Sequence, residues 1–286
     1  MDLCDIQQIK ALLARHGFRF SKSMGQNFLI QSWVPRDIAE ASGAGPGTGV
    51  LEIGPGIGPL TTQLAQRADR VVAVELDRSL QPILAETLAD RPNVSVVYGD
   101  VLKTDLAALA AERFQGLRPL VCANLPYNIT TPVITAFLEA GCFQTITVMI
   151  QREVARRICA APGTGDYGAF SVFCQYHAQT ELLFDVPPDC FLPAPKVTSS
   201  VLRLTPKEPP AEVDDPEHFF RVVKAAFAQR RKTLLNGLSA AFGSQYSKEA
   251  LSEMLADCGL PAGIRGERLG IPEFARLSKL LRQNSQ

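Results

Sequence analysis

From about residue 50 to residue 151, short apolar runs alternate with segments of helical periodicity, and this alternation limits the folds open to the chain. The apolar runs are rich in Val, Ile and Leu and lie at 49–54, 71–76, 94–100, 120–125 and 146–151. Strands that are apolar along their whole length and separated by helices are typical of a parallel sheet buried on both faces. The sequence therefore predicts a doubly wound α/β domain.

Two more β-rich runs follow a helical stretch at about 151–178. They are LLFDVP (182–187) and SSVLRLTP (199–206), and their short connection predicts an antiparallel pair at the sheet edge. Together with the five earlier runs they give a mostly parallel sheet of seven strands, with one antiparallel strand at the edge.

The two ends of the chain differ from this middle part. Near the N-terminus, residues 5–17 have helical spacing, with Asp5 as the predicted cap, and a proline- and acid-rich linker at 206–218 precedes a stretch that reads only as helices. We expect an α/β domain at 1–209, in which residues 1–35 form an N-terminal helix and a covering segment. A small all-helical domain is expected at 210–286.

Composition excludes some classes of protein. With 46% hydrophobic and 20% charged residues the chain can bury a normal core, and 29 Lys and Arg balance 29 Asp and Glu. A neutral chain argues against binding to nucleic acid by bulk charge, although a local basic face stays possible. No run of about 18 apolar residues occurs and the N-terminus has no secretory pattern. We expect a cytoplasmic protein that does not enter a membrane.

The cysteine and histidine residues do not form a metal motif. Seven cysteines are scattered with no C-x-x-C pair, and the chain has three histidines. Unclustered thiols in a chain of this length indicate free cysteines in a reducing compartment, and a structural zinc site needs clustered ligands. We expect no bound metal.

The first predicted strand runs into the glycine-rich sequence EIGPGIGPL. Gly54, Gly56 and Gly58 allow a tight turn and a close approach of a ligand to the backbone. A dinucleotide-binding loop would need a third glycine where Pro59 stands, and Pro55 has no N–H to offer a pyrophosphate. The loop therefore favours a nucleoside without phosphates.

Three acidic residues lie on or at the ends of the first three strands. Glu52 is on the first strand, Glu75 ends the second and is placed for ribose hydroxyls, and Asp100 ends the third, near an adenine amine. Carboxylates suit S-adenosylmethionine, which carries adenosine, a sulfonium and an ammonium but no phosphate. Each feature alone can be incidental, since glycine turns and solvated strand-end acids are common. Their joint position at the carboxyl ends of consecutive strands indicates a cofactor site.

The fourth strand ends in Asn124-Leu125-Pro126-Tyr127, beside the predicted cofactor site. The exocyclic amine of adenine is a poor nucleophile, and acceptors for both of its N–H groups hold it and direct its lone pair. The Asn124 side-chain oxygen and the Leu125 carbonyl can supply them, with Pro126 setting the turn and Tyr127 offering a face for base stacking. The alternative is an ordinary turn, because Asn and Pro are common turn residues. The position one strand beyond the acids favours the catalytic interpretation.

With these residues in place, the chain resembles the bacterial rRNA adenine N6,N6-dimethyltransferases that act on the small subunit. These belong to the class I methyltransferase superfamily, which has a Rossmann-like sheet. The matching stretches run along nearly the whole chain: SMGQNFL (23–29), LEIGPGIGPLT (51–61), VELD (74–77), GD (99–100), NLPYNIT (124–130), FLPAPKVTSSV (191–201) and FAQRRKTLLN (227–236).

The resemblance adds further roles. It implies that Asn27 and Leu29 help to close the cofactor site and that Phe191 stacks on a flipped adenine opposite Tyr127. It also implies that Gly54, Glu75, Asp100 and Asn124 contact S-adenosylmethionine. The implied substrate is a pair of adjacent adenosines in a 3′-terminal hairpin of small-subunit rRNA, on a naked RNA or an immature subunit, with a monomeric enzyme expected.

A basic stretch without acids lies between Phe219 and Lys248. It predicts an RNA-phosphate surface at Arg221, Lys224, Arg230, Arg231 and Lys232. Lys248 belongs to the same stretch, and Arg15, Arg19 and Lys22 could extend the surface. A charge run on a helix is often only a solvated face, which is the alternative here.

Three other functions stay open from the sequence. The related large-subunit rRNA methyltransferases of the antibiotic-resistance type share most of these motifs. A ribosome-assembly factor whose binding matters more than its catalysis is a second possibility. A nicotinamide oxidoreductase is disfavoured by Pro55 and Pro59 in the loop.

Overall fold

The computed structural model describes residues 1–20 and 25–284, so Lys22 and the start of the SMGQNFL stretch lie outside the described residues. The chain forms two compact units. The first contains Met1–Ala155 and Gln179–Pro206, and the second contains Arg156–Ala178 and Lys207–Gln286.

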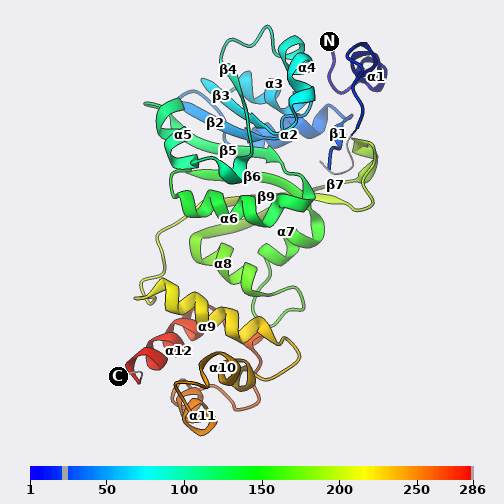
Figure 1. Ribbon diagram of the computed structural model, residues 1–286. Coiled ribbons are helices and arrows are strands. Elements are labelled where there is room, and N and C mark those ends of the chain that lie inside the picture. Colours follow the sequence, from blue (N-terminus) through cyan, green and yellow to red (C-terminus); the bar gives the residue numbers. More distant parts are fainter. Residues whose placement is uncertain (21–24, 285–286) are drawn as a thin grey trace. The chain divides into compact units, whose positions relative to one another are not determined.

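The first unit is built on a seven-stranded sheet with the order β4-β3-β2-β5-β6-β9-β7 (Figure 1). The strands are β2 (Thr48–Ile53), β3 (Arg70–Glu75), β4 (Val94–Tyr98), β5 (Arg118–Asn124), β6 (Thr145–Gln151), β7 (Ala178–Val186) and β9 (Ser199–Pro206). Strands β2 to β6 are parallel, and every residue of β2 is buried. The predicted Rossmann-like sheet is confirmed.

The antiparallel strand lies one position further in than expected. Strand β9 runs antiparallel to β6 and lies between β6 and β7, so β7 forms the edge. The burial of the two strands explains this order. Val201, Leu202 and Leu204 of β9 are fully buried, whereas most of β7 is partly or fully exposed. The more apolar strand takes the inner position.

Helices lie against both faces of the sheet, with α2 and α3 on one face and α6 on the other (Figure 1). The helices of this unit are α1 (Ile6–Arg15), α2 (Trp33–Ala41), α3 (Pro59–Ala65), α4 (Gln81–Thr87), α5 (Leu106–Arg113) and α6 (Thr130–Ala140); α7 (Arg152–Ile158) follows β6. Helix α1 begins where predicted, because the Asp5 carboxylate accepts hydrogen bonds from the backbone N–H groups of Gln7 and Gln8.

A two-stranded ladder that the sequence did not predict joins two distant segments. Strand β1 (Phe28–Leu29) pairs antiparallel with β8 (Phe191–Leu192), which places Leu29 opposite Phe191. The Ile30 N–H also donates to the Cys190 carbonyl at 2.9 Å. The covering segment is therefore tied to the loop that carries Phe191.

The second unit is helical. Its helices are α8 (Ala169–His177), α9 (Pro216–Ala228), α10 (Leu234–Phe242), α11 (Lys248–Asp257) and α12 (Ile271–Gln283). Its core combines α8 with the C-terminal helices, with the ring of Tyr176 5.5 Å from that of Phe219. The unit thus takes in residues 156–178, whereas the sequence predicts that these residues belong to the sheet domain.

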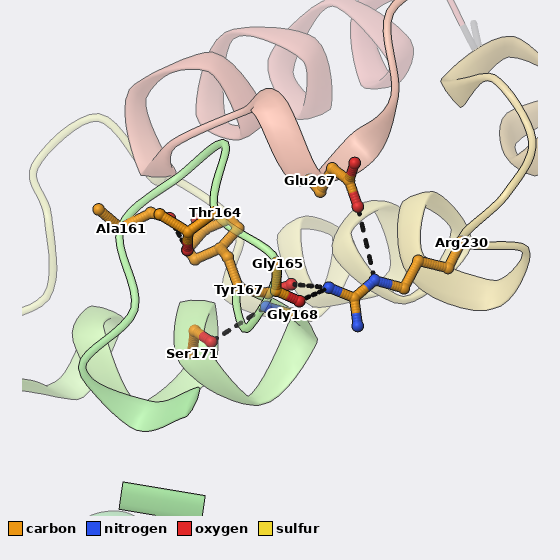
Figure 2. Close-up of polar contacts among 8 residues, drawn as sticks. All are labelled: Ala161, Thr164, Gly165, Tyr167, Gly168, Ser171, Arg230 and Glu267. Carbon is orange, nitrogen blue, oxygen red and sulfur yellow. Dashed lines mark hydrogen bonds and ion pairs between the residues drawn. The ribbon is translucent and has the colours of Figure 1, made fainter. Parts of the chain in front are cut away.

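Arg230 binds the loop at 161–168 to the rest of this unit. Figure 2 shows its guanidinium between the Glu267 carboxylate, at 3.5 Å, and the carbonyl oxygens of Gly165 and Tyr167. The Gly163 N–H also donates to the Glu267 carbonyl at 2.7 Å. Across the described residues, no helix has the length and apolar character needed to cross a membrane.

Candidate active site

A cavity of about 240 Å³ opens at the carboxyl ends of β2, β3, β4 and β5. This is where ligands bind in open α/β sheets. All twelve residues predicted for the cofactor and catalytic sites line it: Asn27, Leu29, Glu52, Gly54, Gly56, Glu75, Asp100, Asn124, Leu125, Pro126, Tyr127 and Phe191. The folding of the sheet brings these scattered positions together.

The glycine loop has the geometry that its sequence predicts. Gly54, Gly56 and Gly58 have φ values of 66°, 60° and 95°, in the left-handed region that favours glycine. A Cβ atom on Gly56 would also come within 3.2 Å of the Phe28 ring. The bare backbone of the loop therefore forms one wall of the cavity, with the covering segment packed against it.

Glu52 is a buried acid at the base of the cavity. Its side chain is 1% exposed, and its Oε2 atom has no hydrogen-bond partner among the described residues. Burial raises the pKa of Glu52 to about 8, and the nearby Glu75 carboxylate adds to the rise. An unpartnered, buried carboxyl oxygen that faces a cavity suits a ligand that donates hydrogen bonds or carries positive charge.

Glu75, at the end of β3, is also buried but is held by the backbone. Its Oε1 atom accepts a 2.7 Å hydrogen bond from the Asp77 N–H. Burial raises the pKa of Glu75, and backbone hydrogen bonds from Asp77, Gly56 and Leu76 oppose that rise. The carboxylate is thus fixed in one orientation at the rim of the glycine loop.

Asp100 follows β4 and its side chain is also fixed. Its carboxylate accepts a 3.0 Å hydrogen bond from the Leu102 N–H, which caps the short helix η3 (Val101–Lys103). Two apolar side chains that line the cavity, Leu76 and Leu102, are 54% and 43% exposed. Exposed apolar side chains beside strand-end acids suit a flat ring with polar edges.

The NLPY residues form the opposite side of the cavity. Asn124 is the last residue of β5 and is half-buried, and its carboxamide has no hydrogen-bond partner among the described residues. The Leu125 N–H donates to the Met149 carbonyl at 3.1 Å, which fixes the following peptide. Tyr127 begins the short helix η4 (Tyr127–Ile129), and its hydroxyl lies 2.7 Å from the Ser199 hydroxyl.

The covering segment closes the cavity from the N-terminal side. The Asn27 side chain donates to the Gly25 carbonyl at 3.1 Å, and Gln26 donates to an Asp77 oxygen at 2.6 Å. Leu29 and Phe191 are 2% and 3% exposed and belong to one apolar cluster. Phe191 lines the cavity while most of its ring is packed in that core.

The charges of the cavity indicate what it can hold. Its described lining includes the carboxyl groups of Glu52, Glu75 and Asp100 and no Lys, Arg or His. Phosphates would meet acidic groups without compensating cations, whereas a cationic nucleoside would meet acidic groups that its own charge helps to ionise. The residues present therefore fit a ligand with positive charge and no phosphate.

The predicted RNA-contact residues belong to the helical unit. This unit carries 14 Lys and Arg against 11 Asp and Glu, whereas the first unit carries 15 against 18. The chain as a whole has no net charge, but the helical unit has a net positive charge. Arg221, Lys224, Arg231 and Lys232 are exposed, and the Arg221 guanidinium lies 4.5 Å from the centre of the Phe242 ring.

Several residues of the cavity were missed in the sequence. Gln26 and Phe28 belong to the QNFL stretch. Leu76 directly follows Glu75, and Leu102 lies two residues after Asp100. An apolar residue after a strand-end acid is a usable signal. The contact of Gln26 with Asp77 had no local signal, since 51 residues separate them.

Comparison with known proteins identifies relatives along the whole chain. The sequence model of a family described as "Ribosomal RNA adenine dimethylase" matches residues 17–260. A protein of Geobacillus thermodenitrificans named "Ribosomal RNA small subunit methyltransferase A" is 48% identical over 98% of this chain and 97% of its own length. A protein of the same name from Shouchella clausii is also 48% identical, over 98% of this chain and 96% of its own length.

Solved structures show the same fold. The 23S rRNA methyltransferase ErmE is 29% identical with a TM-score of 0.67, over 90% of this chain and 100% of that chain. A dimethyladenosine transferase from Plasmodium falciparum is 23% identical with a TM-score of 0.76, over 90% of this chain and 98% of that chain. The sheet unit therefore has the class I methyltransferase fold, and the C-terminal helices α9–α12 follow it.

Proposed function

The chain belongs to the ribosomal RNA adenine dimethylase family, and on this premise we propose that it methylates small-subunit rRNA. The reaction transfers methyl groups from S-adenosylmethionine to N6 of two adjacent adenosines in a 3′-terminal hairpin, which gives N6,N6-dimethyladenosine. Relatives with 48% identity over nearly the full length are named as small-subunit enzymes. The large-subunit enzyme ErmE is more distant at 29% identity, which favours the small subunit as substrate.

Different residues of the cavity contact different parts of S-adenosylmethionine in this proposal. Glu75 is placed for the ribose hydroxyls and Asp100 for the adenine amine, with Leu76 and Leu102 against the ring. Gly54 allows close approach, and Asn27 and Leu29 close the site from the covering segment. Glu52 supplies an unpartnered carboxyl oxygen for the positive end of the molecule. When bound, S-adenosylmethionine supplies an electrophilic methyl group.

The Asn124 carboxamide oxygen and the Leu125 carbonyl are the acceptors for the target amine. Together they hold both N–H groups of an adenine and keep its lone pair directed into the cavity. The rigid Leu125 peptide supports this, since its N–H is bonded to Met149 of the neighbouring strand. The scheme needs no general base, because the methylated amine loses its proton to water.

Tyr127 and Phe191 are the stacking surfaces proposed for the flipped base. Base stacking on an aromatic side chain contributes about 1–3 kcal/mol. Tyr127 is half-buried and faces the cavity from η4. Phe191 offers the small part of its ring that its core packing leaves exposed.

We propose that the basic helical unit binds RNA phosphates through Arg221, Lys224, Arg231 and Lys232, while Arg230 holds the 161–168 loop. We propose that the enzyme acts as a monomer. A small-subunit substrate places the enzyme where bacterial subunits are assembled, in the cytoplasm.

The observation that carries this proposal is the Asn124 carboxamide, which is half-buried beside an acid-lined cavity and has no hydrogen-bond partner in the part of the chain that the structure describes. The test compares wild type with Asn124→Ala by mass spectrometry of RNA, after incubation with S-adenosylmethionine and undermethylated small subunits. Wild type should form N6,N6-dimethyladenosine, and the variant should lose at least about 100-fold in rate, the effect of removing one preorganised polar group. Circular dichroism should show the same fold for both.

Two outcomes of that experiment favour the rival functions. Methyl incorporation into isolated large-subunit RNA, and none into small subunits, would favour the resistance-type enzyme. An Asn124→Ala variant that is inactive yet supports normal subunit maturation in cells would favour an assembly role. Full activity of the variant rejects the role of Asn124.

A further inference from the structure

The hydrogen bond between Tyr127 and Ser199 joins the proposed base-binding ring to the sheet. The two hydroxyl oxygens lie 2.7 Å apart, and 72 residues separate them in the chain. We propose that Ser199 is a positioning residue, which fixes the Tyr127 ring in the orientation that stacks on the target adenine. The inference rests on the proposed function.

Ser199 belongs to a rigid part of the fold. It is the first residue of β9, is fully buried, and pairs with Gln151 of β6. The neighbouring Thr198 carbonyl accepts a 3.0 Å hydrogen bond from the Arg152 N–H. The backbone that carries the Ser199 hydroxyl is therefore held in place by its pairing with β6.

Tyr127 has much less support of its own. It lies on η4, a single turn of three residues that follows the strand end and has no side-chain cap. The residue is half-buried, so packing constrains its side chain less than in a core, and the hydroxyl contact adds a constraint at the far end of the ring. Among the described residues, the hydroxyl has Ser199 as its side-chain partner.

A fixed ring matters because a flipped base stacks productively on one orientation of its platform. Ordering that ring before the base arrives removes an entropic cost from the step in which the flipped base enters the site, after the RNA has bound. The loss of the bond should therefore reduce the rate of the bound complex more than it reduces RNA affinity, since RNA affinity comes mainly from phosphate contacts elsewhere.

Ser200 provides a matched control on the same strand. It is also fully buried, but successive side chains of a strand point to opposite faces, and its hydroxyl donates to the Asp185 carboxylate. Replacing Ser200 by Ala removes a buried hydroxyl next to Ser199 without touching Tyr127. A general loss of packing would affect both serine variants alike.

The experiment is a double-mutant cycle of Ser199→Ala and Tyr127→Phe, with Ser200→Ala as control. Single-turnover methylation of undermethylated small subunits is measured per donor-binding site, with S-adenosylmethionine affinity and stoichiometry taken from calorimetry. Each single variant should lose about five- to tenfold in rate, the usual effect of one hydrogen bond. The double variant should lose no more than either single one. Donor affinity and RNA KM should stay within about twofold of wild type.

Other results would overturn the inference. An unchanged Ser199→Ala rate, additive losses, or an equal loss in Ser200→Ala would each show that the bond does not orient the ring. If Ser199→Ala does not fold, Tyr127→Phe still removes the same bond, and an unchanged rate in that variant overturns the inference. A wild-type protein that methylates no adenine overturns both the proposed function and this inference, whereas additive losses in an active enzyme overturn only the latter.

Discussion

Gln26 of the covering segment donates a 2.6 Å hydrogen bond to the Asp77 carboxylate, two residues beyond Glu75. The other Asp77 oxygen accepts from the N–H and hydroxyl groups of Ser79. Hydrogen bonds from Ser79 and Gln26 hold the pKa of Asp77 below its usual range, against the opposing effect of burial. An ionised Asp77 therefore fastens the covering segment over the cavity.

This bond predicts a coupled effect on cofactor affinity. Gln26→Ala and Asp77→Ala should each weaken S-adenosylmethionine binding about three- to tenfold in calorimetry, because the covering segment loses the same attachment. The double variant should be no weaker than the weaker single one. Ser79→Ala keeps the Gln26 bond and serves as the control, with affinity near wild type. Strictly additive losses would mean that the two residues act separately.

Glu52 makes the stability of the protein depend on pH. Its pKa of about 8 in the folded chain lies above the ordinary value of a carboxyl group, so the folded protein keeps a proton that the unfolded chain loses. The contribution of Glu52 to the free energy of unfolding is fully present below about pH 4.3 and is lost as pH rises through the folded pKa. The free energy of unfolding falls by up to about 1.4 kcal/mol per pH unit over this range.

Glu52→Gln removes this titration. In urea unfolding at about pH 6 and about pH 8, the free energy of unfolding of wild type should fall more steeply with pH than that of the variant. Glu75, whose pKa is also raised, is present in both proteins and cancels in the comparison. Parallel pH dependence in the two proteins would show that Glu52 titrates normally.

The sheet and most of the cavity could be predicted because their signals are local. Apolar strands and the residues at their ends are contiguous in sequence, and parallel strands bring those ends to one edge. Glu75, Asp100 and Asn124 followed directly from this rule. The position of β9 between β6 and β7 does not follow from this rule, because both β7 and β9 are short apolar runs and only their relative burial decides their order in the sheet.

The parts that were missed depend on contacts between distant residues. The β1–β8 ladder joins positions 28–29 to 191–192, and Tyr127 meets Ser199 across 72 residues. Residues 156–178 belong to the helical unit because α8 packs into its apolar core, and Arg230 also reaches the 161–168 loop, 65 residues away at Gly165. No periodicity or spacing in one sequence reports such pairs.

Gly237 of α10 lies against the backbone of α9. A Cβ atom there would lie 2.5 Å from the Ala225 carbonyl oxygen, so Gly237→Ala must push the two helices apart although Ala favours helix. We expect a loss of about 1–3 kcal/mol in the helical unit, seen in thermal melts and in faster amide exchange of α9 and α10. Asn236→Ala, one residue earlier, should be near neutral. Equal stability of the two variants would show that the helices adjust freely.

Arg230 and Arg231 are neighbours with different predicted roles. Arg230→Ala breaks the contacts to Gly165, Tyr167 and Glu267 in the helical unit. Because its side chain is 51% exposed, the expected loss of unfolding free energy is only about 1 kcal/mol. Amide exchange should become faster at residues 161–168.

Arg231 is exposed and is proposed to contact an RNA phosphate. Arg231→Ala should leave stability unchanged, weaken binding to the small subunit, and lower the slope of log affinity against log salt by about one phosphate contact. Filter binding at several salt concentrations measures this slope for both variants. If Arg231→Ala keeps the wild-type slope while Arg230→Ala lowers it, the assignment of the two arginines is reversed. The RNA surface then lies at the 161–168 loop, which Arg230 contacts.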